Sequence, residues 1–229
     1  MGRWTLRKRQ EILRSRVEGS RRLVDALAQL QSPPKLFISA SAVGFYGDRG
    51  DEQLTEESGA ASTFLSDVCY QWEAVAKELA VHGVRVVHAR FGIVLGPDGG
   101  ILAKLSLPYR LGLGGRLGSG RQWVSWISLR DLVRGLIHVI EQPSLSGPVN
   151  FAAPHPLRQI DFAQTLAKVL HRPAWFTQPA WLLRILFGKM ADELLLASQR
   201  VFPIKLLQSG FEFLDIDCSE AIRYALDLE

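Results

Sequence analysis

The segment "KLFISASAVGFYGD", residues 35–48, decides the fold. Its apolar first half predicts a buried strand over residues 35–41, and this strand ends in two serines, Ser39 and Ser41. An aromatic-glycine turn, residues 45–47, follows directly. The elements on either side of this strand determine what kind of sheet it joins.

Helices are predicted on both sides of the strand. Residues 5–30 carry apolar side chains at near-helical spacing, and a Ser-Pro-Pro sequence ends the pattern. Residues 62–82 show the same helical spacing of apolar side chains, and Gly83 ends this second helix. The β-branched run "VRVVHARFGIVLG", residues 84–96, then predicts a strand. Helix, glycine and strand in this order form half of a β-α-β unit, so the sheet is predicted to be parallel and buried.

The second half of the chain continues the alternation. Residues 126–142, "WISLRDLVRGLIHVIEQ", predict a short strand entering a helix, with Asp131 near the helix start, where the helix dipole favours a carboxylate. We expect Asp131 to cap this helix rather than to take part in chemistry. A strand is predicted at 147–154, a helix at 158–173 and a mostly helical tail at 178–229. The pattern predicts an α/β protein.

The composition is that of a globular protein with room for one core or two small ones: 229 residues, 47% hydrophobic and 22% charged. The net charge is +4, and in the first 22 residues eight basic side chains face only Glu11 and Glu18. Such a run either binds nucleic acid or another anionic surface, or is a solvated helix face. No base-reading motif accompanies it, so we expect a solvated face and no nucleic-acid partner.

The cysteines and histidines predict neither a disulfide framework nor a metal site. Cys69 and Cys218 are far apart and outside any Cys-x-x-Cys motif, and the five histidines show no metal spacing. We therefore expect a reducing compartment, the cytoplasm. No apolar run is long enough to span a membrane, and no secretory signal follows the N-terminal charges.

A glycine-rich segment, "LGLGGRLGSGRQW", occupies residues 111–123. It lacks the G-x-G-x-x-G spacing of a dinucleotide loop, because the third position counted from Gly112 is Leu117, and a strand pattern follows it. Glycine permits close backbone approach, so the segment is either a substrate-facing lid or a cluster of surface turns. Its place between two predicted strands favours the lid.

The serine strand resembles the one that carries the active-site serine in NAD(P)-dependent epimerases and dehydratases of the short-chain dehydrogenase/reductase type. In those enzymes a tyrosine transfers the substrate proton, and a lysine one helical turn later lowers the tyrosine pKa. Here the matching positions are Leu65 and Cys69, and neither residue can do this. The helix has one tyrosine, Tyr70, with Ala74 four residues on. Tyr46 either approaches the site or packs in the core.

Longer blocks resemble the YfcH-type epimerase family, a group of atypical extended short-chain dehydrogenases/reductases, over essentially the whole chain. The most diagnostic block is "RLGLGGRLGSGRQWVSWI", residues 110–127. Loss of the tyrosine-lysine pair is usual in this family. The other blocks are "ISASAVGFYGD", "QWE", "RFGIVLGPDGGIL", "FAQTLAKVLHRP" and the tail "LLLASQRVFPIKLLQSGFEF".

The resemblance implies an NADP-binding Rossmann-like sheet in residues 1–175 and a small, mostly helical domain on the substrate side in residues 176–229. It implies epimerase or oxidoreductase activity on a small molecule of the nucleotide-sugar type. Ser41 would contact the substrate oxygen. A guanidinium such as that of Arg16 pairs well with phosphate or ribose oxygens. The implied cofactor contacts are Glu11, Arg16, Ser39 and Val94.

One part of the family pattern is absent from this sequence. A family member opens with a strand, a glycine-rich phosphate loop and further β/α units, whereas this chain begins at "GRWTLRKRQEILRSR", where that part would end. The serine strand would then be an exposed sheet edge that can pair with another chain, which is compatible with a homodimer. Two functions remain open: an NADP-dependent enzyme that is inactive or impaired as a truncated chain, and a non-catalytic module that binds a ligand or a protein.

Overall fold

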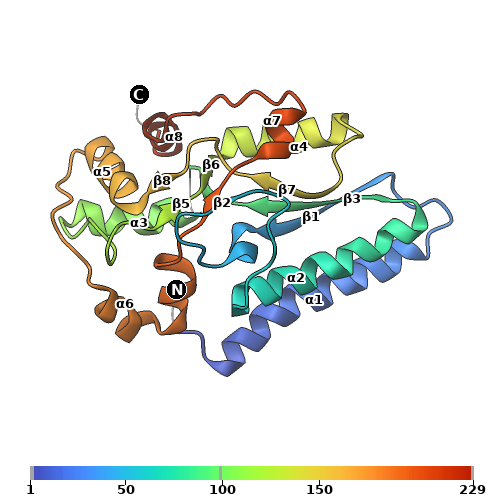
Figure 1. The fold of residues 1–229 in the computed structure, drawn as a ribbon, viewed down its shortest axis with the longest axis horizontal. Helices are drawn as coiled ribbons and strands as arrows, with labels where there is room; N and C mark the ends of the chain where they lie inside the picture. The colour runs from blue at the N-terminus through green and yellow to red at the C-terminus, as the bar shows by residue number, and fades with distance from the viewer. Residues whose placement is uncertain (1–2, 98–99, 228–229) are drawn as a thin grey trace.

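The computed structural model describes residues 3–97 and 100–227 of the chain. Three parallel strands form the central sheet, in the order β1-β3-β7 (Figure 1). They are β1 (Leu36–Ala42), β3 (Arg85–Phe91) and β7 (Gly147–Phe151). The predicted α/β class with a parallel sheet is confirmed. Within the described residues β1 pairs only with β3, so the serine strand is a sheet edge.

Two long helices cover one face of the sheet. α1 (Leu6–Ala28) and α2 (Phe64–Lys77) run side by side along it (Figure 1). A threonine, Thr5 or Thr63, caps each N-terminus by accepting a backbone hydrogen bond from the first turn. Their apolar faces bury a shared cluster with the sheet: Val24, Val75, Ala76, Leu79, Val84 and Val86.

Helix α4 (Leu129–Glu141) covers the opposite face of the sheet (Figure 1). Strand β6 (Trp126–Ser128) leads into it, and Ser128 caps the helix by accepting from the backbone N–H of Asp131. The sequence predicted that Asp131 caps α4, and this prediction is wrong, because Ser128 is the cap. The Asp131 carboxylate accepts instead from the backbone N–H groups of Leu214 and Asp215, 3.0 and 2.8 Å away, and so fixes the tail to the helix.

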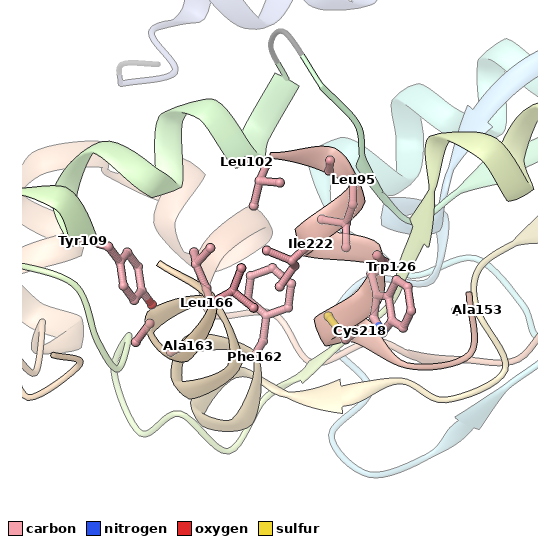
Figure 2. Close-up of a cluster of buried hydrophobic side chains, with 14 residues drawn as sticks. Leu95, Leu102, Tyr109, Trp126, Ala153, Phe162, Ala163, Leu166, Cys218 and Ile222 are labelled. Carbon is pink, nitrogen blue, oxygen red and sulfur yellow. The ribbon is translucent and has the colours of Figure 1, made fainter. Parts of the chain in front are cut away.

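A second core lies beside the sheet and is built from α3 (Gly100–Arg110), α5 (Gln159–Val169) and α8 (Cys218–Ala225). Figure 2 shows Leu102, Phe162 and Ile222 from these three helices converging in it. Residues before and after position 175 share this cluster. The division into domains at 175/176 remains a prediction.

The structure differs from the sequence prediction in three places. The strand predicted over 84–96 is divided at Gly92, because residues up to Phe91 pair with β7 whereas residues from Ile93 onward pair with β6. A Cβ at Gly92 would lie 2.8 Å from the carbonyl oxygen of Ser125. Residues 96–120 are dense in glycine and no helix is predicted there, yet they contain α3, since eleven residues without glycine, 101–111, lie between Gly100 and Gly112. The tail is predicted to be mostly helical, but after one π-helical turn, Ala191–Leu195, residues 196–199 are irregular.

The remaining elements are short and connect the two cores. β4 (Ile93–Leu95) pairs with β6 in parallel. Strand pairs β2 (Gln53–Leu54) with β9 (Arg200–Val201) and β5 (Trp123–Val124) with β8 (Leu157–Arg158) hold the connecting segments together. The other helices are α6 (Ala180–Phe187), α7 (Ile204–Gln208) and the 3-10 turns Val43–Tyr46 and Glu78–His82. None of the helices in the described residues is long and apolar enough to cross a membrane.

Candidate active site

A cavity of about 940 Å³ opens beside the carboxyl end of β1. One wall comes from α1 and the residues just before it, and the floor comes from the end of β1 and the start of α2. The segments around residues 91–93 and 123–125 form a further side, and the tail between α6 and β9 closes the cavity. Three tryptophans line it: Trp4, Trp72 and Trp123.

Ser41 lines this cavity and is bound to a buried ion pair. Its hydroxyl donates to Glu73 Oε1 over 2.6 Å. The Arg90 guanidinium donates to both oxygens of the same carboxylate, from Nε and Nη2, each over 2.8 Å. Arg90 also stacks over the ring of Phe45, with 3.6 Å between its Cζ and the ring centroid. This arrangement holds Ser41 in one orientation.

Tyr46 belongs to the same buried network and not to the cavity wall. It is fully buried, accepts a hydrogen bond from Arg90 over 2.9 Å and donates to Asn150 Oδ1 over 2.7 Å. Burial raises the pKa of its hydroxyl to about 12. Of the two roles left open for Tyr46, the structure favours packing in the core.

The positions that match the missing tyrosine and lysine lie on the cavity floor. Leu65 and Cys69 both line the cavity, next to Ser41. Burial raises the pKa of the Cys69 thiol, so this cysteine is a neutral group there. The backbone N–H of Leu65 donates to Glu193 Oε2 over 2.9 Å, and Glu193 lines the cavity as well.

The wall formed by α1 is basic. Arg3, Lys8 and Arg16 line it. Arg16 Nη1 donates to Ile12 O over 3.4 Å and to Ser15 Oγ over 3.2 Å, and within the described residues no carboxylate pairs with its guanidinium. A cation without a counter-charge beside a cavity suits a phosphate group, so Arg16 fits a phosphate of a dinucleotide.

The structure separates the residues that the resemblance implied for the site. Ser41 and Arg16 lie on the same cavity, whereas Glu11, Ser39 and Val94 are not among its lining residues. Glu11 forms ion pairs with Lys8 and Arg7 on the solvent face of α1, and hydrogen bonds from these two side chains lower its pKa.

Ser39 and Val94 are held in other surroundings. Ser39 is 4% exposed and its hydroxyl lies 3.5 Å from Ala40 O. Val94 pairs with Ile127 and packs into the core under α4, while its neighbour Ile93 reaches the cavity. Contact of Glu11, Ser39 or Val94 with a cofactor remains a prediction.

The other sequence candidates are accounted for within the described residues. Arg7, Arg14 and Arg21 pair with glutamates on the surface of α1 and of the 3-10 turn after α2, which agrees with a solvated helix face. The glycine-rich segment packs against residues 174–178, and Gly118 lines a separate hollow of about 470 Å³, whereas Trp123 at its end lines the large cavity. The role of the segment as a lid remains a prediction. No group of three or more potential metal ligands occurs in the part of the chain that the structure describes.

Sequence reasoning missed the polar residues that support Ser41. Glu73, Arg90 and Asn150 are all buried and linked, directly or through Tyr46. The signal was present for Glu73, because it lies one turn after Cys69 on the buried face of α2. A carboxylate on such a face requires a partner.

Comparisons with known proteins agree with this geometry. Residues 2–151 match the model of the NAD dependent epimerase/dehydratase family. Residues 178–225 match a domain of unknown function, DUF1731. An epimerase family protein of Staphylococcus haemolyticus, SH2119, is 43% identical over 212 residues, which are 92% of this chain and 71% of that protein.

Two solved structures superimpose closely on the chain. The human epimerase family protein SDR39U1 (isoform 2), solved with NADPH, gives a TM-score of 0.93 at 32% identity, over 98% of this chain and 76% of that one. The nucleoside-diphosphate sugar epimerase of Corynebacterium glutamicum gives a TM-score of 0.79 at 35% identity, over 99% of this chain and 44% of that one. Both comparisons extend over nearly all of the present chain.

Proposed function

Because the chain belongs to the NAD dependent epimerase/dehydratase family, we propose that it is an NADP-dependent epimerase or oxidoreductase that acts on a small molecule. Membership confirms the resemblance found in the sequence. The observation that carries the proposal is the placement of Ser41 and Arg16 on one cavity, which combines a fixed hydroxyl with an unpaired cation.

The residues divide the cavity into two parts with different chemistry. The α1 wall, with Arg16 and Lys8, would hold the phosphates of the dinucleotide, and the tryptophans offer flat apolar surfaces beside it. Ser41 would orient a ligand by accepting a hydrogen bond from a hydroxyl group. A bound nicotinamide would supply or accept the hydride. A nucleotide-sugar type of substrate is supported by the solved sugar epimerase and by the hydroxyl groups such a ligand offers.

Cofactor binding is expected to be weaker in this chain than in a Rossmann fold with a complete phosphate loop. No G-x-G-x-x-G loop occurs in the 229 residues, so the backbone amides that hold the pyrophosphate in a Rossmann fold have to be replaced by the cations of α1. We therefore propose that catalysis by this chain alone is impaired. The two buried thiols agree with a reducing, cytoplasmic setting.

An NADPH titration tests the proposal, with energy transfer from the cavity tryptophans to the nicotinamide as the signal. Saturable binding in the micromolar range is expected. A folded sample that shows no energy transfer at millimolar NADPH would reject the proposal. Binding without turnover of any sugar nucleotide would favour a non-catalytic module.

A second candidate function is assembly through the open edge of the sheet. The β1 edge has no partner in the described residues, and α4 exposes an apolar stripe. A second copy that pairs with β1 would extend the sheet, and a dimer that also packs on α4 would cover this stripe. Sedimentation equilibrium tests this: wild type should form dimers and the double variant V133E/I137E should be a monomer. The stripe consists of Leu129, Val133, Ile137 and Ile140.

A further inference from the structure

The cavity contains a carboxylate that the family resemblance does not explain. Glu193 lies in the π-helical turn of the tail and lines the same cavity as Ser41. Among the described lining residues it is the only carboxylic acid, and the other ionisable groups there are cations and the Cys69 thiol. The tail therefore adds a carboxylate to a cavity whose floor offers only the neutral Cys69 thiol as an ionisable group.

The position of Glu193 is defined by one contact. Its Oε2 accepts from the backbone N–H of Leu65 over 2.9 Å, although 128 positions separate the two residues. Leu65 is the position at which the short-chain dehydrogenase pattern has its tyrosine. The chain after α6 returns toward the start of α2, which brings the carboxylate to this point (Figure 1).

The second oxygen of Glu193 is available to a ligand. Within the described residues, the contact with Leu65 is the only hydrogen bond of this side chain, which is half-buried. Arg184, the basic residue of the preceding helix α6, pairs with Asp192 and not with Glu193. One oxygen thus anchors the carboxylate, and the other can accept a proton from the cavity.

We propose that Glu193 is the general base and acid of this cavity, supplied by the tail at the position of the missing tyrosine. In the forward step the O–H bond of a ligand hydroxyl breaks, the proton moves to Glu193, and the electron pair stays on the ligand oxygen. The reverse step returns the proton. The inference rests on the proposed function only for the identity of the ligand.

The alternative role for Glu193 is purely structural: its hydrogen bond to the Leu65 N–H would only link the tail to α2. Glu193→Gln separates the two roles, because a glutamine oxygen still accepts from the Leu65 N–H but cannot take a proton at neutral pH. Glu193→Asp keeps the charge. Asp192→Asn is the matched control, since Asp192 is exposed, lies outside the cavity and pairs with Arg184.

The probe is 5-nitrobenzisoxazole, which opens when a base removes its ring C–H proton: the N–O bond breaks, a nitrile forms and a coloured phenolate leaves. Wild type and D192N should accelerate this opening, with a rate that rises with pH as a carboxylate ionises. E193Q should lose about 100-fold of the acceleration, and E193D should retain part of it. The melting temperature of each variant, compared with that of wild type, checks that the link between the tail and α2 is intact.

Two results would overturn the assignment. One is an E193Q variant that is as fast as wild type. The other is a wild-type rate that equals the rate in buffer, or a wild-type rate whose pH profile shows no ionisation of a carboxylate. This second result is measured on the wild type alone and does not depend on the folding of a variant. The NADPH titration is independent of this probe, so base activity without NADPH binding would reject the proposed function and leave Glu193 assigned.

Discussion

The hydroxyl of Ser41 donates to the Glu73 carboxylate over 2.6 Å, and this fixes the direction in which its proton points. Glu73 is held in turn by two hydrogen bonds from Arg90 and is not among the residues that line the cavity, so the proton of Ser41 points toward the buried ion pair. Toward a ligand, Ser41 therefore offers lone pairs and accepts hydrogen bonds. The cavity floor suits a ligand that brings hydroxyl donors rather than a bare carbonyl.

Replacing Glu73 should destabilise the fold far more than replacing Ser41. In Glu73→Gln the Arg90 side chain, 4% exposed, loses its counter-charge, and the free energy of unfolding should fall by about 3–5 kcal/mol. Ser41→Ala removes one hydrogen bond and leaves the ion pair, so about 1 kcal/mol is expected. Urea unfolding of both variants measures this, and equal stabilities would contradict the network.

Replacing Arg16 should weaken NADPH binding without affecting stability. Arg16 lies on the cavity wall, and its exposed charge is worth about 1 kcal/mol, so Arg16→Gln should raise the Kd about fivefold. The difference should shrink at high salt. Arg14→Gln is the matched control, because Arg14 lies on the same helix, outside this cavity, and pairs with Glu18. If R14Q and R16Q bind alike, Arg16 does not contact the cofactor.

The elements around the serine strand were predictable because their signals are local. The apolar run at β1, the amphipathic spacing of α2 and the glycine between α2 and β3 each depend on residues close in sequence. Their combination predicted a parallel sheet, and with it the placement of Ser41 at the carboxyl end of a strand.

The supporting contacts were not predictable because they join distant segments. Arg90 comes from the strand after α2, and Glu193 reaches Leu65 from a tail that the sequence showed only as helical. The division of the predicted strand at Gly92 depends on the change of pairing partner from β7 to β6 at this residue. No periodicity in a single segment contains such information.

Protonation of His88 should destabilise the fold at acid pH. His88 is 5% exposed on β3, and burial lowers its pKa below the ordinary value near 6.5, with Arg90, Lys77 and Lys205 adding to this and Glu73 opposing it. The unfolded chain then binds a proton that the folded chain does not. Stability is therefore complete above about pH 6.5 and falls as the pH drops toward the folded-state pKa, by at most about 1.4 kcal/mol per pH unit.

Urea unfolding between pH 5 and 7.5 measures this slope. His88→Gln should flatten it relative to wild type, because the variant has no group that titrates at this position. His82→Gln should keep the wild-type slope, since His82 is exposed at the end of the turn after α2. A wild-type slope in H88Q would show that other groups cause the loss of stability at acid pH.

Two glycine-to-alanine changes should have opposite effects. Gly92 separates β3 from β4, and a Cβ there would lie 2.8 Å from the backbone oxygen of Ser125, which cannot move without displacing the strand that pairs with β4. Gly92→Ala should therefore cost about 1–3 kcal/mol. A Cβ at Gly19, inside α1, meets nothing within 4 Å, so Gly19→Ala should add about 0.5–1 kcal/mol. Thermal unfolding distinguishes them, and a neutral G92A would mean that the crossing of β3 and residue 125 is looser than the structure has it.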